Sequence, residues 1–124
     1  PTKTLWWELC AVSKDAANET YDNALKVLNE IKRRIPGVTV YVSAQPSYTP
    51  SSHECSIAGI GGQSRMAGIA SQLIANGKAL TGPNMGPLAY PGQTISDGCH
   101  ANTSGKQLMG QQVIDFFNSV FSSP

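Results

Sequence analysis

The segment covering residues 21–42 limits the possible folds of this chain more than any other. Apolar residues recur there at spacings of three and four, which places them on one face of a helix; they are Tyr21, Ala24, Leu25, Leu28, Ile31 and Ile35. Pro36 and Gly37 end this helix, and the β-branched and aromatic run at residues 38–42 predicts a strand. A second apolar run at residues 5–9 has the length of a strand buried on both faces. A strand, a helix and a strand in this order form a βαβ unit, so we expect parallel pairing and a right-handed crossover.

The rest of the chain continues this alternation. We expect helices at about residues 18–35, 62–76 and 104–121, with Thr103 or Ser104 capping the last one, and a short strand at residues 79–81. Residues 43–56 and 82–92 are rich in Ser, Pro and Gly and are predicted to be loops. The pattern predicts one domain over residues 1–124, a three-layer α/β/α arrangement around a parallel sheet.

Composition excludes several classes of protein. The chain has 124 residues, 40% of them apolar, and a net charge of +1, which favours a packed core over disorder and excludes a strongly basic nucleic-acid surface. The only basic run, Lys32 to Arg34, falls at the end of a predicted helix, where cations offset the helix dipole. No apolar stretch approaches the roughly 20 residues of a membrane span. The chain begins at Pro1 without methionine, so we expect a processed or truncated chain whose targeting segment has been removed.

The cysteines and asparagines favour a secreted protein. Asn18-Glu19-Thr20 and Asn102-Thr103-Ser104 are both N-glycosylation tripeptides. The spacing of the three cysteines matches no zinc pattern. His53, Glu54 and Cys55 are adjacent in a loop, so their side chains should point apart rather than share a metal ion. We therefore expect neither a metal nor a cofactor.

Chemistry in an open parallel sheet is expected at the carboxyl ends of its strands. Asp97-Gly98-Cys99-His100 lies in such a segment, immediately before the last helix. An aspartate three residues before a histidine can fold back onto the imidazole in a tight turn, which fixes its tautomer and stabilises its protonated form. This block, in this position and after this order of elements, resembles the last signature block of the SGNH (GDSL-type) ester hydrolases.

The resemblance implies a serine-dependent ester hydrolase on a flavodoxin-like parallel sheet. In that family the histidine is the general base and the aspartate orients it, so His100 and Asp97 are the expected catalytic residues. The family's Gly-Asp-Ser block is absent from this chain, and residues 8–15 do not contain its Gly-x-Asn-Asp block. We therefore expect a missing N-terminal portion to carry the serine-bearing strand. Ser13 stands at a strand end, but serine is common at such ends and in helix caps, which favours a structural role.

Two further expectations follow, the first from the predicted parallel sheet and the second from the resemblance. The loops that carry Cys55 and Cys99 should meet at the same end of the sheet, which favours a Cys55–Cys99 disulfide and leaves Cys10 free or paired with a missing partner. Without the serine-bearing strand, residues 5–9 become an exposed edge strand that invites association with an N-terminal portion or with a second copy of the chain.

The sequence leaves two functions open. One is an ester hydrolase, or its C-terminal portion, acting on an acetylated carbohydrate, a lipid ester or a short acyl ester. The other is a non-catalytic binding module that kept the scaffold and lost the serine. The scaffold cannot decide between them, because function depends on the site rather than on the fold.

Overall fold

A parallel sheet forms the centre of the molecule. The computed structural model describes residues 3–122. In it β1 (Lys3–Leu9) pairs with β2 (Val38–Ala44), and β2 pairs with β4 (Leu80–Thr81), both in parallel. The strand order is β1-β2-β4. The predicted βαβ unit and the predicted third strand are therefore confirmed, and the chain has a small α/β fold.

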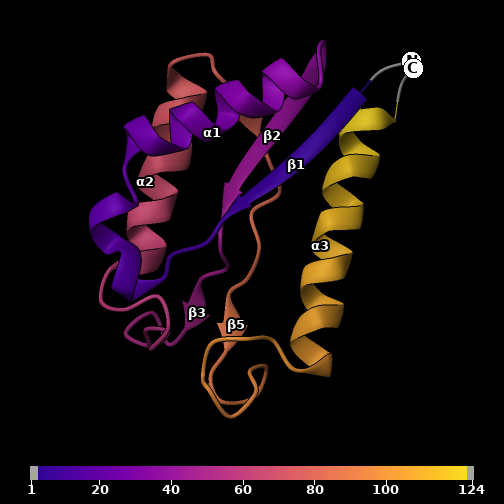
Figure 1. Ribbon diagram of the computed structural model, residues 1–124. Coiled ribbons are helices and arrows are strands. Elements are labelled where there is room, and N and C mark those ends of the chain that lie inside the picture. The colour runs from indigo at the N-terminus through magenta and orange to yellow at the C-terminus, as the bar shows by residue number, and fades with distance from the viewer. Residues whose placement is uncertain (1–2, 123–124) are drawn as a thin grey trace.

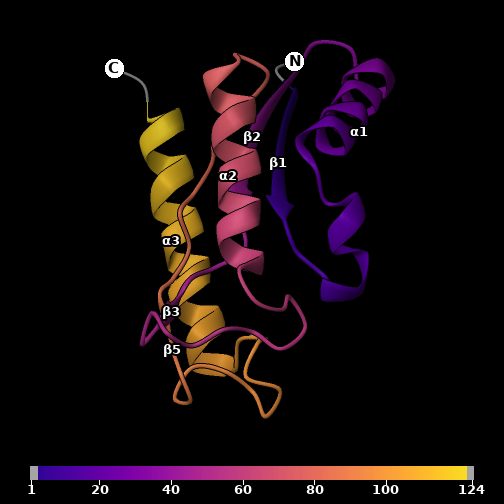
Figure 2. The same ribbon diagram turned by 90° about the vertical axis from the view of Figure 1, so that its left-hand side faces the viewer.

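The helices lie on both faces of this sheet. Figures 1 and 2 show α1 (Tyr21–Arg34) and α2 (Gly62–Ala75) on one face and α3 (Thr103–Phe121) on the other. Alternate residues of β2 serve the two faces: Val40 and Val42 join the buried cluster that contains Leu28 of α1 and Leu73 of α2. Tyr41, between them, points to α3, where its ring packs edge-on against Phe117 with the centroids 5.4 Å apart.

The polar residues between β1 and α1 form an additional short element. Ser13–Asn18 is a 3-10 helix, η1, and Thr20 then caps α1 by accepting a hydrogen bond from the Asn23 backbone N–H. The helix predicted from residue 18 therefore begins at Tyr21, because the Thr20 cap determines where the α-helical hydrogen bonds start.

The predicted cap of the last helix is wrong. Asn102, rather than Thr103 or Ser104, caps α3, and its Oδ1 accepts from the Gly105 backbone N–H at 3.0 Å. The side-chain nitrogen of Asn102 donates to Gly92 O at 2.8 Å. The first residue of this predicted glycosylation tripeptide therefore caps α3 through its oxygen and contacts the preceding loop through its nitrogen.

Two of the predicted loops also contain strands. β3 (Tyr48–Thr49) and β5 (Leu88–Ala89) pair in parallel and form a second, two-stranded sheet below the first (Figure 1). Two residues show no periodicity, and the Ser, Pro and Gly residues around these two strands predict loops, so the residue pattern did not indicate them. This small sheet brings the loop after β2 against the loop that leads to α3.

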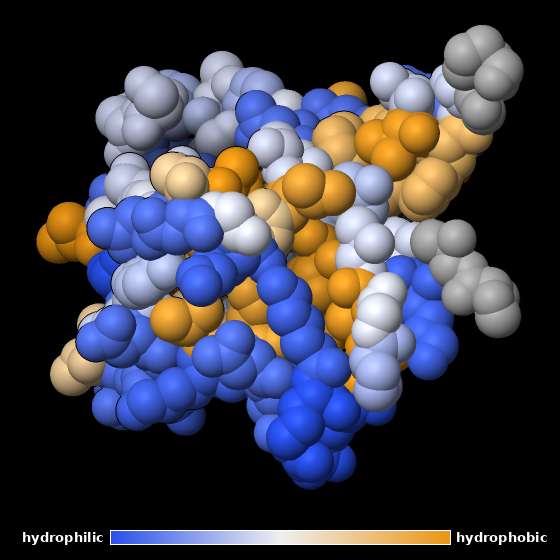
Figure 3. Space-filling model, turned by 90° about the horizontal axis from the view of Figure 1, so that it is seen from above, coloured by the Kyte–Doolittle hydropathy of each residue, from blue (hydrophilic) through white to orange (hydrophobic). Residues whose placement is uncertain are grey.

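The surface at the C-terminal end of α3 is partly apolar. Val120 and Phe121 remain exposed there, and Figure 3, seen from above, shows hydrophobic residues gathered on its upper right side next to hydrophilic ones. Among the described residues, no helix is both long and apolar enough to cross a membrane.

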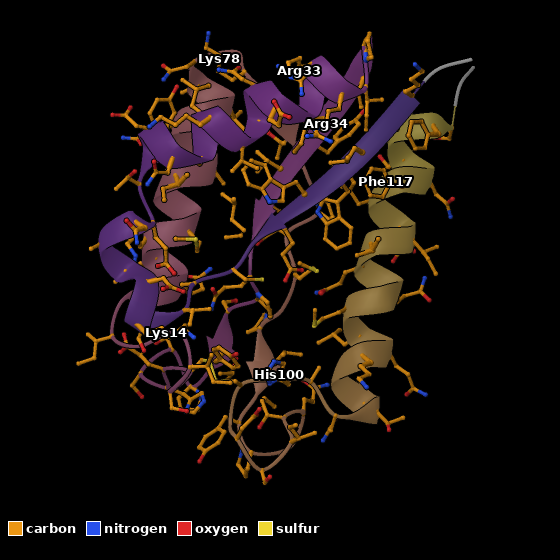
Figure 4. All side chains as sticks on the ribbon, in the orientation of Figure 1. Lys14, Arg33, Arg34, Lys78, His100 and Phe117 are labelled. Atoms are coloured by element: carbon orange, nitrogen blue, oxygen red, sulfur yellow. A yellow bond between two sulfur atoms is a disulfide. The ribbon has the colours of Figure 1, made fainter. Side chains whose placement is uncertain are left out.

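The basic run lies far from the candidate site. Figure 4 shows Arg33 and Arg34 at the upper end of the molecule and His100 near its lower end. Both arginines are in the last turn of α1, as predicted, and both form ion pairs with Glu30. The single carboxylate of Glu30 therefore offsets part of their charge within α1 itself.

We expect Leu73→Ala to lower the free energy of unfolding by about 2–5 kcal/mol, because Leu73 is fully buried and its removal leaves a cavity. Val27→Ala, at an exposed position of α1, is the control and should change it by no more than about 0.5 kcal/mol. Urea denaturation of both variants measures the difference, and equal effects would contradict the packing described here.

Candidate functional site

The Asp97–His100 segment forms a compact turn between β5 and α3. The Nδ1 of His100 lies 2.5 Å from Asp97 Oδ2. The other carboxylate oxygen, Oδ1, accepts from the backbone N–H groups of Cys99 at 2.8 Å and of His100 at 3.0 Å. The carboxylate is therefore held by the turn on one side and holds the imidazole on the other.

Gly98 makes this turn possible. Its φ angle of +68° lies in the left-handed region, which residues other than glycine rarely adopt. A Cβ at this position would also stand 3.1 Å from the ring of Tyr90. The second residue of the Asp-x-x-His block must therefore be glycine, both because of its backbone conformation and because a side chain would crowd Tyr90.

The pKa of Asp97 is lowered to about 2. The first cause is the hydrogen bond with His100, and the backbone N–H of Cys99 adds to it. Asp97 is therefore ionised at neutral pH and can only accept hydrogen bonds, so the neutral imidazole carries its proton on Nδ1. This arrangement leaves Nε2 of His100 with a free electron pair, as a general base requires.

Three contacts from the segment that follows β2 hold the turn. Cys55 and Cys99 form the predicted disulfide, with a Cα–Cα distance of 4.7 Å. The Tyr48 hydroxyl donates to Cys99 O at 2.8 Å, and His53 Nε2 lies 2.7 Å from Gly98 O, to which it must donate because a carbonyl only accepts. Each of the two residues directly before His100 is thus fastened to the loop at residues 48–55.

His100 lies where two hollows meet. The first, which we call the β1 hollow, has a volume of about 240 Å³ and is lined by residues that include Glu8, Cys10, Gln45 and His100. The second, the α3 groove, is more open, with a volume of about 700 Å³, and its walls include Trp6, Met109, Val113 and Ile114. The side chain of His100 is 68% exposed, so ligands can reach it from both sides.

Among the described residues that line these two hollows, none is a serine. Ser13, the alternative weighed from the sequence, begins η1, where its backbone N–H donates to Ile57 O. Its side chain stands against Gly59 and lines neither hollow. The structure therefore brings His100 and Asp97 together, and among residues 3–122 it places no serine hydroxyl in the hollows beside them.

Cys10 is the only free thiol among the described residues that line the β1 hollow. Partial desolvation of its sulfur, its hydrogen bond to Glu8 Oε1 and the negative charge of that carboxylate raise its pKa to about 12. A thiol with this pKa stays protonated at neutral pH, and the thiolate is the reactive form. Cys10 is therefore a poor substitute for the expected serine, although it is the free cysteine.

The side chains of residues 53–55 do not form a metal site. Cys55 is in the disulfide, His53 stacks on Tyr90, and Glu54 accepts from the Gly61 backbone N–H. Within residues 3–122 no three His, Cys, Asp or Glu side chains are arranged to hold a metal ion.

Two further residues of this site, Gln45 and Tyr48, were not among the predicted site residues. Gln45 lines the β1 hollow, and Tyr48 fastens the turn through its hydroxyl group. The available signal was position, because Gln45 directly follows β2, at the carboxyl end where ligand-binding residues are expected.

Comparisons with known protein families, with curated proteins and with solved structures found no match to this chain. The chemistry of the site is therefore judged from its own residues.

We expect the double variant Cys55→Ala/Cys99→Ala to lower the free energy of unfolding by about 3–5 kcal/mol, because the disulfide closes a long loop in the unfolded chain. Cys10→Ala is the matched control and should have a small effect, because Cys10 forms no disulfide. Urea denaturation is the measurement. A double variant as stable as the parent would show that the bridge does not constrain the chain.

We expect the carboxyl carbon of Asp97 to titrate in NMR with a midpoint near pH 2. His100→Ala should raise this midpoint toward the usual aspartate value of about 4, because the largest cause of the shift is removed. The lowered pKa stabilises the fold above about pH 4, and this contribution is lost as the pH falls toward 2. An unchanged midpoint in His100→Ala would contradict the pairing.

Proposed function

We propose that this chain is the C-terminal portion of a secreted serine-dependent ester hydrolase of the SGNH type. The observation that carries the proposal is the Asp97–His100 pair. Its carboxylate is fixed by two backbone N–H groups, its imidazole is oriented through Nδ1, and its free Nε2 stands at the junction of two hollows. These are the positions of the orienting acid and the general base in a Ser-His-Asp arrangement.

In this mechanism Nε2 of His100 removes the proton from a serine hydroxyl as the serine oxygen attacks the ester carbonyl. Asp97 stabilises the imidazolium that forms, and the imidazolium then gives its proton to the departing alcohol. A water molecule, activated by the same nitrogen, hydrolyses the acyl-serine and releases the carboxylic acid.

The strand order supports the location of the missing serine. In a flavodoxin-like sheet the order is 2-1-3-4-5, so three parallel strands in sequence can be its last three. β1 would then be the third strand, and its edge opposite β2, which pairs with no other described strand, would receive the first. A strand in parallel there would end beside Cys10, at the mouth of the β1 hollow. This is the proposed three-layer arrangement, completed by an N-terminal portion of the same protein.

The disulfide supports the proposal that the protein is secreted. Cys55 and Cys99 are bonded, and structural disulfides persist in oxidising compartments such as the extracellular space.

The alternative is a binding module that uses the same hollows without catalysis. The observation that favours it is the lack of a serine among the described residues that line them. A serine-directed fluorophosphonate distinguishes the two functions, because only an activated serine reacts. The probe should be applied to native material in which intact mass has established whether an N-terminal portion accompanies this chain.

In the complete protein we expect His100→Ala and Asp97→Asn each to lower kcat/KM for a p-nitrophenyl ester by about 10²- to 10⁴-fold, the contribution of general acid–base catalysis. Asp115→Asn, the same change at an exposed position of α3, should leave kcat/KM unaltered. A complete protein that shows neither labelling nor ester hydrolysis would overturn the esterase in favour of the binding module. Full activity of the isolated chain would instead show that a hydroxyl within these residues is the nucleophile.

A further inference from the structure

Gln45 is held rigidly at the end of β2. The residue is only 8% exposed, and its backbone N–H donates to Leu9 O at 2.8 Å. Its side-chain Oε1 accepts from the Ala11 backbone N–H at 2.6 Å. Because a backbone N–H can only donate, the oxygen of the amide must face Ala11, and the Nε2 end must face the other way.

The Nε2 group of Gln45 has no acceptor among the described residues. Within them no buried side-chain nitrogen or oxygen is both sealed from solvent and without a partner. The Nε2 group therefore reaches open space, and Gln45 borders two such spaces. One is the β1 hollow that contains His100, and the other is a second hollow of about 240 Å³, which we call the polar hollow.

The polar hollow is lined by groups suited to oxygen-rich ligands. Besides Gln45 it includes Ser47, Ser51, Gln63 and Ser64, and it shares Tyr48 and Cys55 with the β1 hollow. None of these three serine hydroxyls forms a hydrogen bond to another described residue, whereas Gln63 Nε2 donates to the backbone O of Gln45. Several free donors and acceptors thus converge on one concave space, as in sites for polar small molecules.

We propose that the polar hollow, which Gln45 helps to line, binds a polyhydroxylated group of the carbohydrate class. An alkyl chain in this space would cover the Gln45 amide and the serine hydroxyls without offering them hydrogen bonds, whereas sugar hydroxyls both donate and accept. The assignment of this group as the alcohol part of the ester rests on the proposed function. Of the three substrate classes left open by the sequence, it selects the acylated carbohydrate.

The test is an NMR titration of the ¹⁵N-labelled chain with methyl α-D-glucopyranoside, and with octanoate as the apolar probe. We expect the glucoside, at concentrations up to about 100 mM, to shift the Gln45 side-chain amide signals and the backbone amides of Gln63 and Ser64. Octanoate should leave these signals in place.

Variants then assign the binding to the proposed groups. Gln45→Glu keeps an oxygen for Ala11 but replaces the free donor by an acceptor, and it should raise the Kd for the glucoside at least about fivefold. Ser64→Ala, at an exposed position of α2 where alanine favours the helix, should also weaken binding. Gln72→Glu, the same charge change at an exposed position of α2, should leave the Kd as it is.

Absence of glucoside shifts, an octanoate response at the same signals, or an unchanged Kd in both Gln45→Glu and Ser64→Ala would overturn the carbohydrate subsite. Glucoside binding requires no serine nucleophile, so it is independent of the fluorophosphonate result. Glucoside binding without fluorophosphonate labelling of the complete protein would therefore contradict the esterase proposal and support the carbohydrate subsite. Labelling without glucoside binding would support the esterase proposal and contradict the subsite.

Discussion

The parallel pairing of β1 with β2 is the constraint on which the site depends. Because the two strands run in the same direction in register, from Lys3 opposite Val38 to Leu9 opposite Ala44, their carboxyl ends leave the sheet side by side. The next residues remain joined, since Gln45 donates to Leu9 O and accepts from the Ala11 backbone N–H. An antiparallel pair would have placed these two ends on opposite sides of the molecule.

The turn that carries His100 depends on the β1–β2 pairing indirectly, through the segment that follows β2. Its internal hydrogen bonds are local, because the carboxylate of Asp97 reaches groups only two and three residues away. Its place in the molecule is set by the loop after β2, through the disulfide from Cys55 and through the side chains of Tyr48 and His53. The buried sheet and the exposed catalytic candidate are thereby linked by covalent and polar contacts rather than by apolar packing alone.

The longer elements were correctly predicted because many of their residues follow one period. α1 and α2 each bury a stripe of apolar side chains, and β2 contains a β-branched run, so local pattern and burial agree. β3 and β5 were missed because each is a strand of two residues inside a segment rich in Ser, Pro and Gly, whereas β4, equally short, closely follows the Asn-Gly that ends α2 and was predicted. The α3 cap was placed one or two residues too late because Asn, Thr and Ser at residues 102–104 are all good caps, and only the approach of Gly92 selects Asn102.

The sequence by itself determined the βαβ unit, the Cys55–Cys99 pair and the contact between Asp97 and His100, because each follows from periodicity, from loops at one end of a parallel sheet, or from a spacing of three residues in a tight turn. Only the tertiary structure decided what surrounds His100. It brought the Gln45 amide to the hollows, placed the Cys10 thiol next to the Glu8 carboxylate, and left serine out of both walls beside His100. These outcomes depend on where side chains from separate loops point once the strands have paired, and no pattern within one segment encodes that direction.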